Sequence, residues 1–130
     1  MSDDKTSSDL RAQGDKIRRE VLGDARVDST TRDPDAFNAP LIDYLTKYAW
    51  GDVWSRPGLD KRSRSILNLG MLSALGRADE LRLHIRGALI NGVTKEEIQE
   101  IFLQVAVYCG APAALEVFKV AEEVFEEDGV

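Results

Sequence analysis

Helical periodicity is the feature that most limits what this chain can fold into. Apolar residues recur every three or four positions along most of the sequence, and no stretch alternates between apolar and polar residues with a period of two. Glycines interrupt this pattern at Gly76, Gly92 and Gly110, and glycine is the residue on which helices most often end. The sequence therefore predicts an all-α fold of about six helices.

Capping signals place the ends of these helices. Ser7 or Ser8 is a candidate cap for the first helix, and Asn38 and Asp60 are candidates for the second and third. The run Thr94-Lys95-Glu96-Glu97 is a capping box, which fixes the start of the fifth helix. We therefore expect helices over about residues 8–22, 39–50, 61–75, 76–91, 95–108 and 112–127.

The segments between the helices also carry information. We expect residues 1–6 to be frayed, Asp24 to Pro34 to form a polar surface loop, and Gly51 to Leu59 to form a turn that carries aromatic Trp54 with an arginine and a proline. Very short links join the third, fourth and fifth helices, which predicts antiparallel packing of neighbours. The last helix has apolar side chains on more than one face, which predicts a subunit interface there.

Length and composition restrict the class of protein. A chain of 130 residues predicts one compact domain over residues 1–130, and its net charge of −6 argues against a nucleic-acid partner. No run approaches the roughly 20 apolar residues of a membrane span, and the acidic N-terminus is no secretory signal, so we expect a cytoplasmic protein with no membrane partner. A single cysteine, Cys109, and a single histidine, His84, argue against a disulfide, a dithiol redox centre or a zinc site within one chain.

The stretch GRADELRLHIRGALINGVT, residues 76–94, concentrates the candidate chemistry. His84 is the one side chain whose ordinary pKa, about 6.5, lies near neutrality, so it could donate or accept a proton. Glu80 lies one helical turn away, where a carboxylate could orient the imidazole ring and favour its charged form. The alternative is a histidine that serves packing only.

Arginines in and near this stretch suit an anionic ligand. Guanidinium binds carboxylate through two parallel hydrogen bonds and keeps its charge at all accessible pH values. Arg77 lies on nearly the same face as Glu80, and Arg86 follows on the same helix, whereas Arg82 is more simply explained as part of a solvated face. Arg56, in the aromatic turn, is a further candidate.

Aromatic residues and the cysteine complete the set of candidate site residues. Trp50 and Trp54 could wall a pocket or could fill the core. Tyr108 and Cys109 lie at the break between the last two helices, where backbone amides could bind an anion, although a lone cysteine is commonly a small buried apolar residue.

Three blocks of the sequence resemble the gamma-carboxymuconolactone decarboxylase family. They read YAWGDVWSRPGLDKRSRS, GRADELRLHIRGALINGVTKEEI and QVAVYCGAPAALEVFKVAEEV, and the resemblance covers roughly Phe37 to Glu127. The wider superfamily contains alkylhydroperoxidase-like proteins, in which a helix carries Cys-x-x-Cys-x-x-x-His. If His84 is placed on that histidine, Arg77 and Glu80 stand where the cysteines would be, and Ser65 stands near a motif glutamate. The dithiol of the peroxidases is therefore absent from this chain.

The resemblance implies a fold, an assembly and a reaction. It implies an all-α, alkylhydroperoxidase-like bundle that forms a homo-oligomeric ring, a homohexamer or a homotrimer. The implied reaction is the decarboxylation of 4-carboxymuconolactone to 4-oxoadipate enol lactone and CO₂, a step of the beta-ketoadipate pathway in protocatechuate degradation, with a small lactone dicarboxylate as substrate and no cofactor. Within it we assign His84 as proton donor or dienolate stabiliser, Glu80 as the residue that orients it, and Arg77 and Arg86 as carboxylate ligands.

Two other functions remain open from the sequence. The chain could be a family member that has lost activity and serves as a binding or assembly protein. It could also be a thiol-dependent reductase that works through Cys109.

Overall fold

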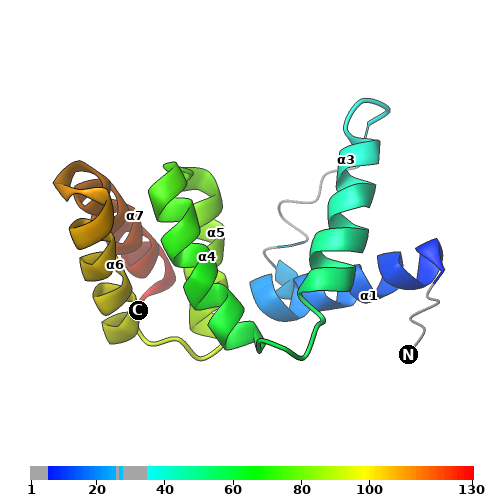
Figure 1. Ribbon diagram of the computed structural model, residues 1–130, viewed down its shortest axis with the longest axis horizontal. Coiled ribbons are helices and arrows are strands. Elements are labelled where there is room, and N and C mark those ends of the chain that lie inside the picture. The colour runs from blue at the N-terminus through cyan, green and yellow to red at the C-terminus, as the bar shows by residue number, and fades with distance from the viewer. Residues whose placement is uncertain (1–5, 26, 28–34) are drawn as a thin grey trace. The chain divides into compact units, whose positions relative to one another are not determined.

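The structure is a computed structural model that describes residues 6–25, 27 and 35–130. Throughout the described residues the secondary structure is helical and no strand occurs, as the periodicity predicts. The chain divides into two compact units, residues 1–60 and 61–130 (Figure 1). The helices are α1 (Ser7–Leu22), α3 (Ala39–Tyr44), η1 (Leu45–Val53), α4 (Lys61–Leu75), α5 (Ala78–Ile90), α6 (Lys95–Cys109) and α7 (Ala111–Asp128).

The single domain expected from the chain length stays a prediction. None of the helices in the described part of the chain is both long and apolar enough to cross a membrane.

In the first unit, α1 begins at Ser7, earlier than a cap at either Ser7 or Ser8 would allow. Thr6 is the cap: its hydroxyl accepts from the backbone N–H of Asp9 at 3.1 Å, and the Asp9 carboxylate accepts from the backbone N–H of Thr6 at 3.2 Å. This reciprocal pair orders Thr6, which we expected to be frayed. Met1 to Lys5 lie outside the described residues.

The second helix runs further than its sequence pattern predicts. Asn38 stands at the expected cap position, but its side chain accepts from the backbone N–H of Asp35 rather than from the helix. The helix continues from α3 into η1, a π-helix that ends at Val53 instead of at Trp50. Gly51, expected to open a turn, is therefore helical, because a π-helix has no sequence signature that distinguishes it from the end of an α-helix.

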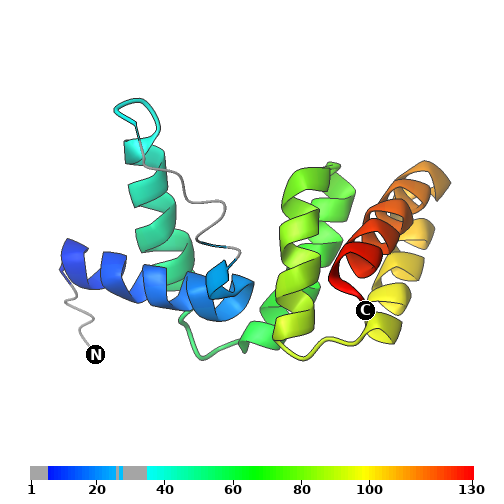
Figure 2. The same ribbon diagram turned by 180° about the vertical axis from the view of Figure 1, so that it is seen from behind.

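A close crossing of α1 and η1 holds the first unit together. Gly14 on α1 lies against the backbone of Thr46, and Gly51 on η1 lies against the backbone of Leu10, so that a Cβ atom on either glycine would overlap the other helix. Gln13 adds a hydrogen bond of 2.8 Å from its amide nitrogen to the Gly51 carbonyl oxygen. Both views in Figures 1 and 2 show α1 running across the lower part of the second helix.

The core of the first unit includes part of the segment that we expected to be a polar loop. Val27 is fully buried, and it belongs to one cluster of buried side chains with Ile17, Val21, Leu22 and Trp54. Asp24, Ala25 and Val27 adopt helical conformation, so the loop expectation is wrong for them, because burying Val27 outweighs the polar character of the segment. Arg26 and the stretch 28–34 lie outside the described residues.

The second unit is an antiparallel four-helix bundle. Figures 1 and 2 show α4, α5, α6 and α7 running alternately up and down. α4 packs on α5 and α6, and α7 packs on the same two helices. α5 and α6 therefore occupy opposite corners of the bundle, although the short link Asn91 to Thr94 joins them and predicts that they are direct neighbours. Short links fix the direction of a helix more firmly than they fix its neighbour.

Helix ends in the second unit agree closely with the sequence signals. Thr94 and Glu97 form the predicted capping box, with both hydrogen bonds at 3.0 Å. Gly92 and Gly110 adopt φ values of 91° and 94°, which side chains other than glycine rarely allow, and this is why α5 and α6 end there.

The bundle core departs from the sequence pattern at two helices. The apolar stripe that the sequence predicts for α4 consists of Ile66, Leu67, Gly70, Met71 and Ala74. The buried residues of this helix are instead Ser65, Leu69 and Ser73, whereas Leu67 and Met71 are about half exposed. In α7 most of the apolar surplus is used inside the bundle, since five of its residues are buried and Leu115 alone among its large apolar side chains is markedly exposed. The exposed apolar surface of this unit therefore lies chiefly on α4 and α6, not on α7 as we expected.

Candidate functional site

His84 lies where α5 faces α4. Leu81, Ile85 and Ala88 bury one side of α5 in the bundle core, and this sets the neighbouring side, with His84, toward α4. The side-chain nitrogen Nδ2 of Asn68, on α4, lies 3.5 Å from Nδ1 of His84. His84, the central candidate residue, is therefore held between two helices and does not lie on a loop.

Burial makes His84 a neutral group at physiological pH. The protein around the ring excludes water and lowers the pKa of His84 to about 4, while the negative charge of Glu80 opposes this change only in part. We expected a histidine that titrates near neutrality. The difference arises because sequence spacing reveals the carboxylate neighbour but does not reveal how much protein surrounds the ring.

This lowered pKa predicts a pH-dependent stability. The unfolded chain, with a histidine pKa of about 6.5, binds a proton before the folded chain does, so the contribution is fully present above pH 6.5 and is lost as the pH falls toward 4. Between pH 7.5 and pH 5 we expect the wild type to lose about 2 kcal/mol of unfolding free energy that His84→Gln does not lose. Urea unfolding of both proteins at the two pH values measures this difference. Parallel pH dependence of the two proteins would contradict it.

Arg77 and Glu80 lie at the start of α5. Arg77 occupies the cap position, and Glu80 belongs to the first turn, where a carboxylate is favoured by the positive end of the helix dipole. Both side chains are exposed. Arg77 precedes His84 by seven residues, about two turns of the same helix.

Arg82 and Arg86 are used to hold α5 to α7. Arg86 donates from Nε to Asp128 at 3.0 Å and from its terminal nitrogen to Glu127 at 2.5 Å, and Arg82 forms an ion pair with Glu123. This pairing raises the pKa of Arg82 and lowers the pKa of the Glu123 carboxyl. Arg82 is therefore part of a cross-helix ion pair and not simply of a solvated face, and Arg86 could bind a ligand only by exchanging its present carboxylate partners.

Tyr108 and Cys109, at the end of α6, line a shallow apolar groove of about 520 Å³ between α4 and α6. Both side chains are exposed, Tyr108 by 79%, so Cys109 is not the buried apolar residue that a lone cysteine commonly is. Glu100 is the single charged residue among those that line the groove. The groove is therefore poorly suited to a dianion and better suited to an apolar surface.

Trp50, Trp54 and Arg56 belong to the first unit. The two indole rings stack with centroids 5.0 Å apart, and Trp54 is 8% exposed within the core of that unit. Arg56 is exposed. The core-filling alternative therefore applies to Trp54, while a ligand contact by Trp50 or Arg56 stays a prediction.

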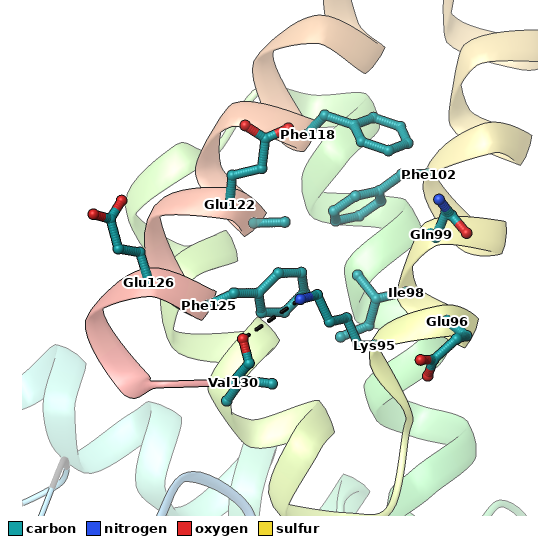
Figure 3. Close-up of a pocket in the computed structure, with 11 residues that line it drawn as sticks. Lys95, Glu96, Ile98, Gln99, Phe102, Phe118, Glu122, Phe125, Glu126 and Val130 are labelled. Atoms are coloured by element: carbon teal, nitrogen blue, oxygen red, sulfur yellow. Dashed lines mark hydrogen bonds between the residues drawn. The ribbon is translucent and has the colours of Figure 1, made fainter.

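A larger cavity, of about 580 Å³, lies between α6 and α7 (Figure 3). Figure 3 shows Phe102, Phe118 and Phe125 between the two helices, with Lys95 donating to the carbonyl oxygen of Val130 at 3.4 Å. Its lining includes Glu96, Glu122 and Glu126 but a single cation, Lys95. Three carboxylates against one ammonium group repel a dianion, so this cavity lacks the charge that the candidate chemistry needs.

Sequence reasoning did not include Asn68 or Asn91 among the candidate site residues. Asn91 donates from its side chain to the Ser65 hydroxyl at 3.2 Å, and Asn68 faces His84. The four side chains form a polar seam between α4 and α5, and Ser65 is fully buried. The available signal was spacing: Ser65 and Asn68 are three residues apart on one helix, and His84 and Asn91 are seven apart on the other. In the described part of the chain, no group of three or more His, Cys, Asp or Glu side chains is arranged to hold a metal ion.

Comparison with known proteins identifies the family of this chain. The model of the carboxymuconolactone decarboxylase family matches residues 39–123, which extend from α3 almost to the end of α7 and include His84 with every other candidate site residue. The chain belongs to this family. Its match to the family model contains the polar seam between α4 and α5 as well as the first turn of α5.

Two relatives in this family are decarboxylases with different named substrates. The chain is 43% identical to a 4-carboxymuconolactone decarboxylase of Acinetobacter baylyi over 91% of its own length and 88% of that protein. It is 41% identical to a nitrosuccinic acid decarboxylase of Metarhizium robertsii over 98% of its own length and 92% of that protein. An uncharacterized 15.0 kDa protein of Paracoccus denitrificans is 35% identical over 61% of the chain.

Proposed function

We propose that the protein is a cytoplasmic decarboxylase that converts 4-carboxymuconolactone to 4-oxoadipate enol lactone and CO₂. The observation that carries this proposal is the 43% identity, over 91% of the chain, with a 4-carboxymuconolactone decarboxylase. The neutral, partly buried His84 and the exposed Arg77, which lies about two turns earlier at the start of the same helix, support it as a suitable pair of groups.

The substrate supplies its own electron sink. Its departing carboxylate is attached gamma to the lactone carbonyl, across a carbon–carbon double bond. When the bond to CO₂ breaks, its electron pair moves through that double bond onto the carbonyl oxygen and forms a dienolate. A proton then adds to the ring carbon alpha to the carbonyl. The protein must hold a dianion, stabilise the dienolate oxygen and allow that proton to arrive.

The described residues suggest how these tasks are divided. Arg77, exposed at the start of α5, is suited to bind a carboxylate. His84, neutral because of its pKa of about 4, is suited to donate a hydrogen bond to the dienolate oxygen and is a poor source of the proton. Glu80, one turn earlier on the same helix face, raises the pKa of His84 against the effect of burial. Arg86 would join the site only if it exchanged Glu127 and Asp128 for substrate.

A second candidate substrate is nitrosuccinic acid, because the chain is 41% identical over 98% of its length to a decarboxylase of that acid. The chemistry is parallel: loss of CO₂ beside a nitro group places the electron pair on nitro oxygens, which a hydrogen-bond donor also stabilises. Incubation of the purified protein with each acid, with measurement of CO₂ release, distinguishes the two. We expect faster release from the lactone. Release from neither would favour a family member without activity, and activity lost on alkylation of Cys109 would favour a thiol mechanism.

Arg77→Ala should weaken catalysis through loss of a carboxylate contact. We expect kcat/KM to fall by the worth of a charge-assisted hydrogen bond, about 1.5–3 kcal/mol in transition-state terms. Arg77→Lys should recover little, since an ammonium group cannot make the two-pronged contact. Arg86→Ala is the matched comparison on the same helix. Because Arg86 already pairs with Glu127 and Asp128, its loss should lower the unfolding temperature, and it should lower kcat/KM less than Arg77→Ala does. Unchanged steady-state kinetics in Arg77→Ala would remove this residue from the site.

The protein should associate into a homo-oligomeric ring, for which we propose six subunits, with three as the alternative. Exposed apolar side chains on α4 and α6, among them Met71, Leu103 and Val107, support this proposal, as does the apolar groove that Tyr108 lines between the same two helices. Val107→Glu should shift the assembly toward monomer, and Leu115→Glu, on the exposed side of α7, is the control. Sedimentation velocity at micromolar concentration measures both. A wild type that sediments as a monomer would contradict the proposal.

A further inference from the structure

The second helix of the first unit carries a row of large apolar side chains that its own core does not use. Phe37 is 94% exposed, and the other members of the row are each between 43% and 59% exposed. They follow one another at spacings of three or four residues, which places them on one side of the helix. The rings of Tyr44 and Tyr48 lie with their centroids 5.2 Å apart. We call this row the aromatic stripe; it consists of Phe37, Leu41, Tyr44, Leu45 and Tyr48.

The area of the aromatic stripe is that of one side of a protein interface. A large aromatic side chain offers roughly 150–250 Å² of surface, so the three rings of the stripe expose on the order of 400 Å², and the two leucines add to this. An interface of ordinary size covers about 800 Å² of each partner, of which somewhat more than half is apolar. The stripe therefore supplies the apolar area that one partner of such an interface needs.

The groove between α4 and α6 is a concave apolar surface on the same chain. It has a volume of about 520 Å³, and its lining includes Ile66, Ile101 and Val105. Gly70 also lines it, and the space that a Cβ atom of Gly70 would enter is open. A missing side chain in the middle of α4 leaves a notch, and side chains of another helix pack by entering notches of this kind.

Polar groups limit what the groove can accept. Glu100 is the single charged residue of its lining, and Gln104 adds an amide. Both side chains offer oxygen atoms that accept hydrogen bonds, and tyrosine hydroxyls can donate to them. The aromatic stripe carries two tyrosines and no charged side chain. A row of apolar side chains with hydroxyl donors therefore suits this groove better than a strongly charged segment does.

We propose that the aromatic stripe of one copy of this chain lies in the α4–α6 groove of a second copy. Each copy then offers one stripe and one groove, so the contact repeats from copy to copy, and such a contact closes into a ring when the rotation between copies allows it. A contact of stripe with stripe would pack two convex rows together and would leave both grooves uncovered. This contact rests on the homo-oligomer proposed above for the presence of a second copy.

Photo-crosslinking tests which surfaces meet. Tyr44→p-benzoylphenylalanine places a photoreactive ring in the middle of the stripe, at a position that is already about half exposed. After irradiation of the full chain, we expect a covalent dimer on a denaturing gel, with position 44 joined to a peptide from residues 61–75 or 95–109. A cross-link within one chain, a cross-link to the stripe of the other copy, or no cross-link at all would overturn the proposal.

A charge in the stripe should weaken the assembly. We expect Tyr44→Glu to raise the dissociation constant of the oligomer by about 30-fold or more, as the loss of a central interface side chain does. Ala12→Glu is the matched control, because it adds the same charge at an exposed position on α1 of the same unit. Sedimentation velocity measures both variants, and circular dichroism checks that each is folded.

Failure of this inference is distinguishable from failure of the other proposals. An oligomer that is as stable in folded Tyr44→Glu as in the wild type would overturn the stripe-to-groove contact and leave the oligomer standing. A monomeric wild type would overturn both. CO₂ release, measured separately on the wild type, decides the proposed reaction whatever the outcome of these two experiments.

Discussion

Replacing His84 by alanine is expected to lower turnover by about 10²–10³-fold while the bundle stays folded. The neutral ring is suited to donate a hydrogen bond where negative charge develops, and such a donor is worth most in a site that water has left. His84→Ala removes this donor and leaves the charge of Arg77 in place, so kcat should fall more than KM rises. Circular dichroism of the variant checks that the loss does not come from unfolding.

His84→Gln separates hydrogen bonding from proton transfer. Glutamine can donate from its amide but does not titrate, so we expect it to retain clearly more turnover than alanine does. Equal loss in both variants would instead make His84 the proton donor, against its lowered pKa of about 4. Glu80→Gln removes the neighbouring charge that opposes this lowering, so any fall in activity at acid pH should move to still lower pH.

Replacing Gly14 by alanine should destabilise the first unit by about 3 kcal/mol, at the upper end of what overpacking costs. A Cβ atom at this position would lie 1.7 Å from the carbonyl oxygen of Thr46, and the contact is with backbone, which cannot turn aside as a flexible side chain can. α1 and η1 would have to separate, which would also strain the hydrogen bond from Gln13 to Gly51.

Gly70→Ala is the control for this prediction. Gly70 lies inside α4 with open space where its Cβ would be, so the same substitution should stabilise its helix by about 0.5–1 kcal/mol. Urea unfolding followed by circular dichroism measures both variants. A Gly14→Ala variant as stable as the wild type would show that the two helices do not cross as closely as described.

Local signals predicted the helices well, because a cap or a glycine acts through atoms close to it in sequence. Thr94 and Gly110 place the limits of α6 within one residue. The buried face of α4 was not predictable in this way. Ser73 satisfies its hydroxyl by donating to the Leu69 carbonyl oxygen at 2.6 Å, within its own helix, so a serine can enter the core at little cost and an apolar pattern identifies the wrong face.

The candidate site was predictable in its residue types and not in its electrostatics. His84, Glu80 and Arg77 stand out by chemistry and spacing along one helix. The lowered pKa of His84 and the partners of Arg86 depend on α4 and α7, which are distant in sequence. Asn68 was absent from the sequence-based set for the same reason, since its spacing from Ser65 places both on one helix face but does not indicate that this face meets a histidine.

The polar seam between α4 and α5 also determines how these two helices are aligned along their length. Apolar faces tolerate a slide of one turn, about 5.4 Å, with modest change in buried area. The same slide would separate Asn91 from Ser65 and Asn68 from His84. Ser65 is fully buried, and a buried hydroxyl that loses a partner costs about 1–3 kcal/mol, so a misaligned pairing of the two helices is penalised there. A cavity-filling redesign that made this interface wholly apolar would then be expected to gain stability and to lose the single alignment on which a catalytic geometry depends.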